Sequence, residues 1–228
     1  MKLYKLAHSG APTAMSDLQA LIARLPVMKR RFETACAAYE ELALRAASRV
    51  AWTQWSAKPF HSPFPFGIER ERGQAPGKPM KTAPQRIVGK WFHGIAEDGS
   101  VALIHEFVSE QGQRYEEYWE HRADGIDTTL YDYHEPASNV LNVQRIDLLD
   151  AQPATFLRYA RYGVRAEVYR YTDGRLSQID GAAKEHAAAG EPIFTTDQLH
   201  YVDGRLERVV RTWSESGISE RIYPTSGQ

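Results

Sequence analysis

Four Asp-Gly dipeptides, each between runs that alternate apolar and polar residues, constrain this chain more than any other feature. They stand at positions 98–99, 124–125, 173–174 and 203–204. Asp-Gly favours tight hairpins, because both residues tolerate a positive φ and glycine does so without steric cost. The intervals between them are 26, 49 and 30 residues, so the pattern is not a solenoid of fixed period. The sequence after Lys90 therefore predicts an antiparallel β-meander.

The alternating runs around these turns predict roughly nine or ten strands. Segments 168–176 and 199–206 are near copies of one hairpin, and 118–126 keeps the same outline. Further strands are expected over 140–149 and 156–162, and Ser216-Gly217 is expected to turn one more hairpin before 218–223. The alanine-rich segment 182–190 indicates a short helix or a loop.

Two helices are predicted before the sheet. Ser16 and Gln19 fit a capping box that opens the first helix, and Pro26 ends or kinks it. From Met28 to Val50 an apolar residue recurs every three or four positions, which predicts a second helix of about six turns. We expect the apolar stripe of both helices to be buried on the chain's own sheet, with docking to a partner subunit as an alternative.

Segment 58–90 carries six prolines and seven basic residues, which predicts an extended connector. Phe60, Phe64 and Phe66 indicate that the connector packs on the sheet. The predicted class is thus α+β: two N-terminal helices followed by a large, curved antiparallel β-meander. The expected divisions are a helical region 1–57, the connector 58–90 and a meander domain 91–228.

The charge of the chain is unevenly distributed. Residues 1–90 hold 15 basic and 6 acidic residues, a balance of +9, whereas residues 91–228 hold 13 and 23, a balance of −10. Within the second part, residues 91–135 hold 11 acids and two bases. Unless these charges are simply solvated and have no partner, there are two explanations: the basic segment lies on the acidic one within the molecule, or one of the two faces an oppositely charged partner.

Composition indicates a cytoplasmic protein. No apolar run approaches the length of a membrane span, and the N-terminus has no continuous apolar stretch like that of a signal peptide. The single cysteine, Cys36, excludes an intramolecular disulfide and fits a reducing compartment. Because Cys36 lies among alanines on the second predicted helix, we expect a packed thiol.

The sequence holds no recognisable catalytic motif, such as a Gly-rich phosphate loop, a nucleophile elbow or a Cys-x-x-Cys pair. Catalysis by a pair of acids would need two carboxyls to converge in one cleft. Neighbouring strand residues such as Glu116 and Glu117 point to opposite faces instead. His121 and His134 would form a metal site with Glu117 or Asp132 only if their hairpin brought them together. We therefore predict a protein that is not an enzyme and has no metal or cofactor.

Two resemblances bear on function. The pattern Tyr-x-Tyr-x-Asp-Gly-Arg-Leu at 169–176, with a partial copy at 201–206, resembles the hairpins of tyrosine-aspartate (YD) repeats in bacterial Rhs-type proteins. Residues 100–180 resemble the β-meander immunity proteins of bacterial polymorphic toxin systems, through segments 103–107, 114–120 and 131–133. The second resemblance implies a cytoplasmic, non-enzymatic protein that blocks one cognate toxin.

The leading hypothesis is accordingly an immunity-type inhibitor that meets a basic toxin domain through an acidic, tyrosine-rich surface. The residues expected to bind this partner are Glu116, Glu117, Tyr118, Trp119, Glu120, Asp127, Tyr131 and Asp132. The alternative is a small-molecule-binding protein or hydrolase with a pocket in the concave sheet face. That pocket would be lined by Trp91, His105, Trp119 and His121. Membrane and nucleic-acid partners are not expected, and the oligomeric state is left open.

Overall fold

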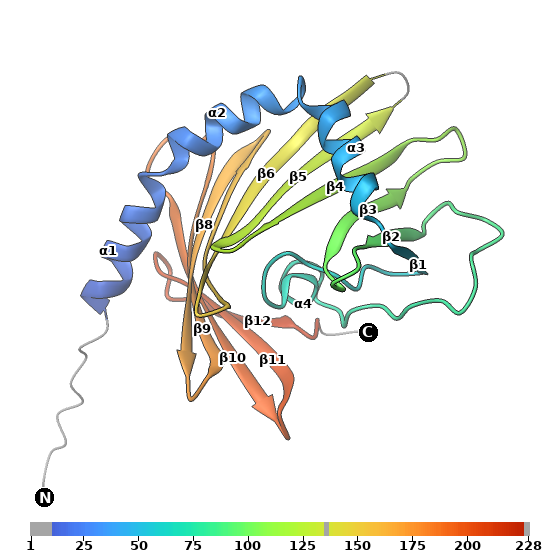
Figure 1. Ribbon diagram of the computed structural model, residues 1–228. Coiled ribbons are helices and arrows are strands. Elements are labelled where there is room, and N and C mark those ends of the chain that lie inside the picture. The colour runs from blue at the N-terminus through green and yellow to red at the C-terminus, as the bar shows by residue number, and fades with distance from the viewer. Residues whose placement is uncertain (1–10, 135–136, 226–228) are drawn as a thin grey trace, which may run out of the picture.

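The computed structural model describes residues 11–134 and 137–225, and its main element is one antiparallel sheet of twelve strands (Figure 1). Each strand pairs with the next along the chain, from β1 at one edge to β12 at the other. The strands are β1 (Trp52–Ser56), β2 (Trp91–Ile95), β3 (Val101–Phe107), β4 (Arg114–Arg122), β5 (Gly125–His134), β6 (Ala137–Leu149), β7 (Gln152–Ala160), β8 (Gly163–Thr172), β9 (Arg175–Glu185), β10 (Ile193–Val202), β11 (Arg205–Trp213) and β12 (Ser219–Tyr223). The α+β class and the meander are confirmed, whereas the predicted strand number is too low.

Two segments that the sequence did not predict to be strands belong to the sheet. Strand β1 falls inside the expected helical region 1–57, and its residues pair with β2 from Trp52 opposite Ile95 to Ser56 opposite Trp91. The alanines at 182–183 belong to β9, and Ala182 is buried in the core beneath the helices, so the predicted helix does not form and the loop begins only after Glu185. The sheet therefore includes a strand from the expected helical region as well as the strands of the meander.

The Asp-Gly turns are confirmed most clearly in the hairpins β8–β9 and β10–β11. Asp173 and Gly174 have φ values of 52° and 73°, and the corresponding pair at 203–204 has 48° and 79°. At 124–125 the predicted hairpin forms between β4 and β5, but its turn consists of Ala123 and Asp124, and Gly125 starts β5. A Cβ on Gly125 would lie 2.2 Å from the carbonyl oxygen of Ile146. Close strand packing, and not a positive φ, requires this glycine.

Three helices precede the sheet instead of two: α1 (Ala11–Ile22), α2 (Leu25–Ala35) and α3 (Tyr39–Arg49). Ser16 lies inside α1, so it is not the N-cap. The predicted second helix is interrupted at 36–38, which lets α2 and α3 follow the curvature of the sheet (Figure 1). Cys36 lies at this break and is exposed, so the expectation of a packed thiol was wrong.

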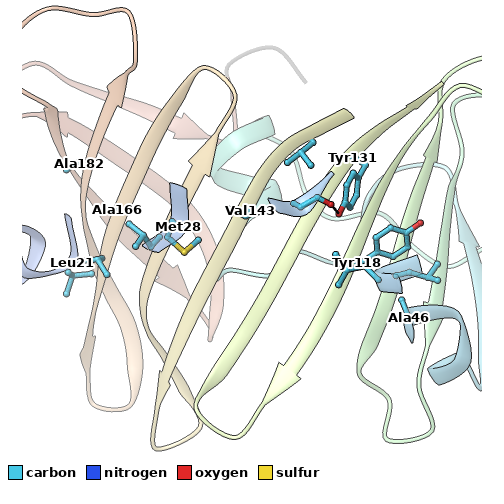
Figure 2. Packing of buried hydrophobic residues seen from close by; sticks show 14 of the residues in the cluster. Leu21, Met28, Ala46, Tyr118, Tyr131, Val143, Ala166 and Ala182 are labelled. Atoms are coloured by element: carbon cyan, nitrogen blue, oxygen red, sulfur yellow. Dashed lines mark hydrogen bonds between the residues drawn. The ribbon is translucent and has the colours of Figure 1, made fainter. Parts of the chain in front are cut away.

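The helices cover the face that we call the outer face of the sheet. Helix α1 packs on β7 to β9, α2 on β6 and β7, and α3 on β3 and β4. Figure 2 shows the resulting core, in which Leu21 and Met28 from the helices meet Ala166 and Val143 from the strands. The apolar stripe of the helices is thus buried on the chain's own sheet, as expected.

The same packing explains the uneven charge. Arg31 of α2 pairs with Asp127 of β5, and an Arg45 Nη of α3 lies 2.7 Å from a Glu120 carboxyl oxygen of β4. Arg24, just before α2, pairs with Asp147 of β6. Basic residues of the N-terminal part therefore lie on acidic residues of the sheet, which is the first of the two explanations considered above.

The connector crosses the opposite face, which we call the inner face, and includes helix α4 (Gly67–Arg72) (Figure 1). Phe64 packs on Phe156 of β7 with ring centroids 4.6 Å apart, so the connector lies on the sheet as predicted. Arg70 is buried and donates to Glu167 of β8 at 2.7 Å and to Asp197 of β10 at 2.8 Å. These contacts hold α4 against the concave side of the sheet.

Candidate ligand pocket on the inner face

Strand β4 divides the expected partner-binding residues between the two faces of the sheet. Glu116 points to the outer face, where its carboxylate accepts hydrogen bonds from the hydroxyls of Tyr39 at 2.6 Å and Tyr118 at 2.7 Å. Arg114 Nε donates to the other oxygen at 2.6 Å. Burial raises the pKa of Glu116, but these donors outweigh it and leave the pKa below its usual range. Glu116 is therefore part of the packing between α3 and the sheet.

The other predicted partner-binding residues are also withdrawn from solvent. Trp119, Asp127 and Tyr131 are buried, and the Tyr131 hydroxyl donates to the carbonyl of Ala35 at 2.7 Å. Glu120, already paired with Arg45, and Asp132 are half-buried. None of the eight is exposed. The acidic, tyrosine-rich segment thus serves the internal contacts of the chain, and these eight side chains do not form one open surface.

A cavity of about 310 Å³ lies on the inner face, between the sheet and the connector with α4. This volume is at the lower end of the range typical of small-molecule sites. Strands β2 to β7 supply its floor and walls. The apolar part of the lining includes Phe64, Ile68, Trp91, Ile104, Leu130 and Leu141, and the polar part includes His61, Glu71, Arg72, Glu106, Tyr115, Glu117, Asn142, Gln144 and Arg158.

Glu117 lies in this cavity, on the face of β4 opposite to Glu116. Burial raises the pKa of its carboxyl to about 7, and Trp119 and Thr128 beside it only partly oppose this effect. The nearby Glu71 carboxylate raises the pKa further. None of the ion pairs among the described residues involves Glu117. A carboxyl of this kind, in a cavity and without a counter-charge, is typical of functional sites.

Two buried polar atoms in the described lining of this cavity have no hydrogen-bond partner. Gln144 uses its Nε2 to donate to Asn142 Oδ1 at 2.8 Å, and the same nitrogen lies 3.5 Å from Glu117 Oε1. Gln144 Oε1, however, is unpartnered. His61 Nε2, from the connector side of the cavity, is unpartnered as well. Buried polar groups normally find partners, so this concentration in one place is unusual.

The charged groups toward the outside of the cavity, unlike Glu117, are paired. Glu71 accepts from Arg158 at 3.3 Å and from Arg165 at 3.0 Å. Arg72 lies 3.8 Å from Glu106, and its guanidinium lies over the Trp91 ring at 5.0 Å from the centroid. These pairs fasten α4 to β2, β3, β7 and β8 around the cavity.

The cavity agrees only in part with the cleft expected from the sequence. Trp91 lines it, and Trp119 lies beside Glu117 on the same face. His105 was predicted wrongly, because it faces α3 and packs against Tyr118 with ring centroids 6.3 Å apart. His121 is exposed at the end of β4 and bonds the Val101 carbonyl. Gln144 and Asn142 were not predicted, because the face on which they lie depends on the register between β5 and β6, which shifts by one residue between Leu130 and Tyr131.

No group of three potential metal-ligating side chains is found within residues 11–134 and 137–225. His121 pairs with Ile126 at the turn end of the β4–β5 hairpin, whereas His134 ends β5 and pairs with Ala137. The hairpin therefore keeps these two histidines apart. Among the helices that the structure describes, none has the length and apolar character needed to cross a membrane.

Comparison of the chain with family models, with curated proteins and with solved structures found no match.

Proposed function

We propose that this protein binds a small organic molecule in the cavity between α4 and the inner face of the sheet. The observation that carries the proposal is the cavity of about 310 Å³ with unpartnered polar atoms of His61 and Gln144 in its lining. Leaving a buried polar group unsatisfied costs about 1–3 kcal/mol. A ligand that supplies the missing hydrogen bonds would recover this free energy on binding.

The lining has the composition expected of such a site. Small-molecule pockets combine a mostly apolar wall with a few convergent polar groups that orient the ligand. Here Ile104, Leu130 and Leu141 supply apolar surface, while Glu117 and Gln144 converge on one side. The pairing of Arg72 with Glu106 stabilises the position of α4 beside the cavity in the absence of a ligand.

The immunity-type inhibitor remains a separate, untested proposal. Its acidic anchors are engaged inside the molecule, Glu116 by Tyr39 and Asp127 by Arg31. A basic partner would have to displace these contacts or use other residues. Stoichiometric co-purification of a basic protein from the native cell supports the inhibitor, and its absence speaks against it.

A fragment screen by ligand-observed NMR tests the pocket directly. We expect fragments that bind the wild-type protein not to bind the Leu130→Trp variant, because an indole at this position fills the cavity. Leu149→Trp is the matched control, since Leu149 is 68% exposed at the end of β6, outside the cavity. Fragments that bind Leu130→Trp as well as they bind the control would contradict the proposal, as would a screen without any binder.

A further inference from the structure

We infer that the ligand of this pocket is an organic cation, an ammonium or amidinium group on an apolar body, whose charge pairs with Glu117. The inference deepens the proposed function and depends on it. It names the chemical class of the ligand and the side chain that selects it.

The pocket contains one acidic side chain, Glu117, whose charge is not compensated by a basic partner among the described residues. The other acids in the lining already have basic partners, Glu71 in Arg158 and Glu106 in Arg72. Glu117 has none among the ion pairs of the described residues, and the charge that acts on it is the like charge of Glu71, which raises its pKa. A cation placed beside Glu117 would therefore complete the pairing, whereas an anion would add a second repulsion.

Glu117 and Gln144 present hydrogen-bond acceptors to the cavity. Glu117 offers carboxylate oxygens, and Gln144 offers its unpartnered Oε1. Because Gln144 Nε2 lies 3.5 Å from Glu117 Oε1, both acceptors belong to one small region of the cavity. An ammonium group has three donors and no acceptor, so a single such group can satisfy both side chains. Charge-assisted hydrogen bonds of this kind are the stronger ones in proteins.

Apolar side chains line the cavity on both of its sides. Phe64 and Ile68 from the connector and α4 face Ile104, Leu130 and Leu141 of the sheet across the same cavity. A small inorganic cation would leave this apolar surface unused and would find one unpaired carboxylate instead of a cluster of ligands. An apolar body attached to the cationic group fills the space that the aliphatic and aromatic side chains enclose.

Three compounds with the same phenylethyl body separate charge from shape: phenethylamine, 2-phenylethanol and phenylacetate. Calorimetric titration of the full chain at pH 8, where Glu117 is mostly ionised, is expected to give about tenfold tighter binding of the amine than of the alcohol. Phenylacetate is expected to bind most weakly. In Glu117→Gln the amine should lose this advantage while the alcohol binds within about twofold of wild type. Glu97→Gln, an exposed change at the β2–β3 turn outside the pocket, should leave all three affinities unchanged.

The pH dependence gives a second readout that needs no variant. Amines of this type stay protonated below pH 9, as lysine does. The amine affinity should therefore fall between pH 8 and pH 6 as Glu117 takes up its proton, and the alcohol affinity should stay level. The other charged groups around Glu117 are Glu71 and Arg72 of α4, Glu106 of β3 and Arg158 of β7, and His61 faces it from the connector.

Two results overturn the inference while leaving the pocket in place. One is equal binding of the amine and the alcohol, with both lost in Leu130→Trp. The other is binding of none of the three compounds by a protein whose pocket takes up neutral or anionic fragments. Failure of the whole fragment screen would instead overturn the proposed function itself.

Discussion

Glu116 and Glu117 are neighbours in the chain, yet the sheet gives them opposite environments. Glu116 faces α3 and receives hydrogen bonds from Tyr39, Tyr118 and Arg114, which stabilise its charge. Glu117 faces the cavity, where burial outweighs the nearby donors and raises its pKa. One carboxylate therefore stabilises the fold, and the other destabilises it when it is ionised.

Glu117→Gln is expected to stabilise the protein above neutral pH. The pKa of Glu117 is about 7 in the folded state and 4.5 without the protein environment, so the folded state holds its proton more tightly than the unfolded state. Stability is therefore lost as the pH rises from 4.5 through 7, and glutamine removes this loss. The gain should reach at most about 3 kcal/mol at pH 8 and vanish toward pH 4.5. Urea unfolding at both pH values measures it, and a gain that is independent of pH would contradict the assignment.

Arg70→Met is expected to destabilise the protein strongly. Arg70 bridges Glu167 and Asp197, and the loss of the guanidinium leaves these buried carboxylates with Arg165 and Arg211 as ion-pair partners and with the Tyr169 hydroxyl as a donor to Glu167. Breaking a buried ionic network from one side costs about 3–5 kcal/mol. The free energy of chemical unfolding is measured for Arg70→Met and for the control Arg86→Met. The ion pair of Arg86 with Glu110 is exposed and should contribute under about 1 kcal/mol. Equal effects of the two changes would show that the inner network does not hold α4.

At the scale of the element, the hairpin turns differ in whether a glycine occupies the positions that have a positive φ. Gly174 has the positive φ that its turn requires, whereas Asp150 and Ala151 adopt φ values of 51° and 62° in the β6–β7 turn without any glycine. A left-handed conformation costs an L residue about 1–2 kcal/mol. The β6–β7 turn is thus a strained element in an otherwise regular meander, and its sequence carries no Asp-Gly signal.

Ala151→Gly is expected to raise the free energy of unfolding by about 1 kcal/mol, because glycine adopts the positive φ without a clash. Gly174→Ala should lower it by a similar amount, although no atom lies within 4 Å of the added Cβ. Ala123→Gly, in a turn position whose φ is not positive, is the control and should not stabilise. Thermal unfolding of the three variants gives the comparison. A stabilised Ala123→Gly would mean that turn flexibility, and not φ, is responsible.

At the scale of the whole molecule, the sheet depends on covers on both faces. Helices α1 to α3 bury Tyr118, Tyr131 and Val143 on the outer face, and α4 with the connector covers the inner face. Basic residues of the covers meet acidic residues of the strands on both sides. The covers and the sheet therefore share their apolar cores, and basic residues of the N-terminal part pair with acidic residues of the strands.

A chain of residues 51–228 should consequently fail to fold cooperatively. Without α1 to α3, buried side chains such as Tyr131 and Val143 would face water, and the carboxylate of Asp127 would lose Arg31. We expect aggregation or a state that binds a hydrophobic dye and lacks fixed near-ultraviolet dichroism. Leu44→Ser, which changes an exposed residue of α3, should leave the fold intact. A soluble truncated chain with a sharp unfolding transition would show instead that the helices are a separate docking module.

The sequence by itself determined the meander and most of its turns, because strand alternation and Asp-Gly chemistry act over a few neighbouring residues. It also determined that the helices carry one apolar face. It did not determine where α2 ends, because the break at 36–38 follows from the curvature of a sheet formed by distant residues.

Only the tertiary structure decided which acids are structural and which line the pocket. Glu116 and Glu117 read alike in the sequence, and their difference arises from α3 on one side and the connector on the other. Gln144 of β6 lies near Glu117 of β4 because the pairing of β5 with both strands places Gln144 opposite Thr128 and Glu117 opposite Leu130. Such contacts join residues far apart in the chain, and local patterns carry no information about them.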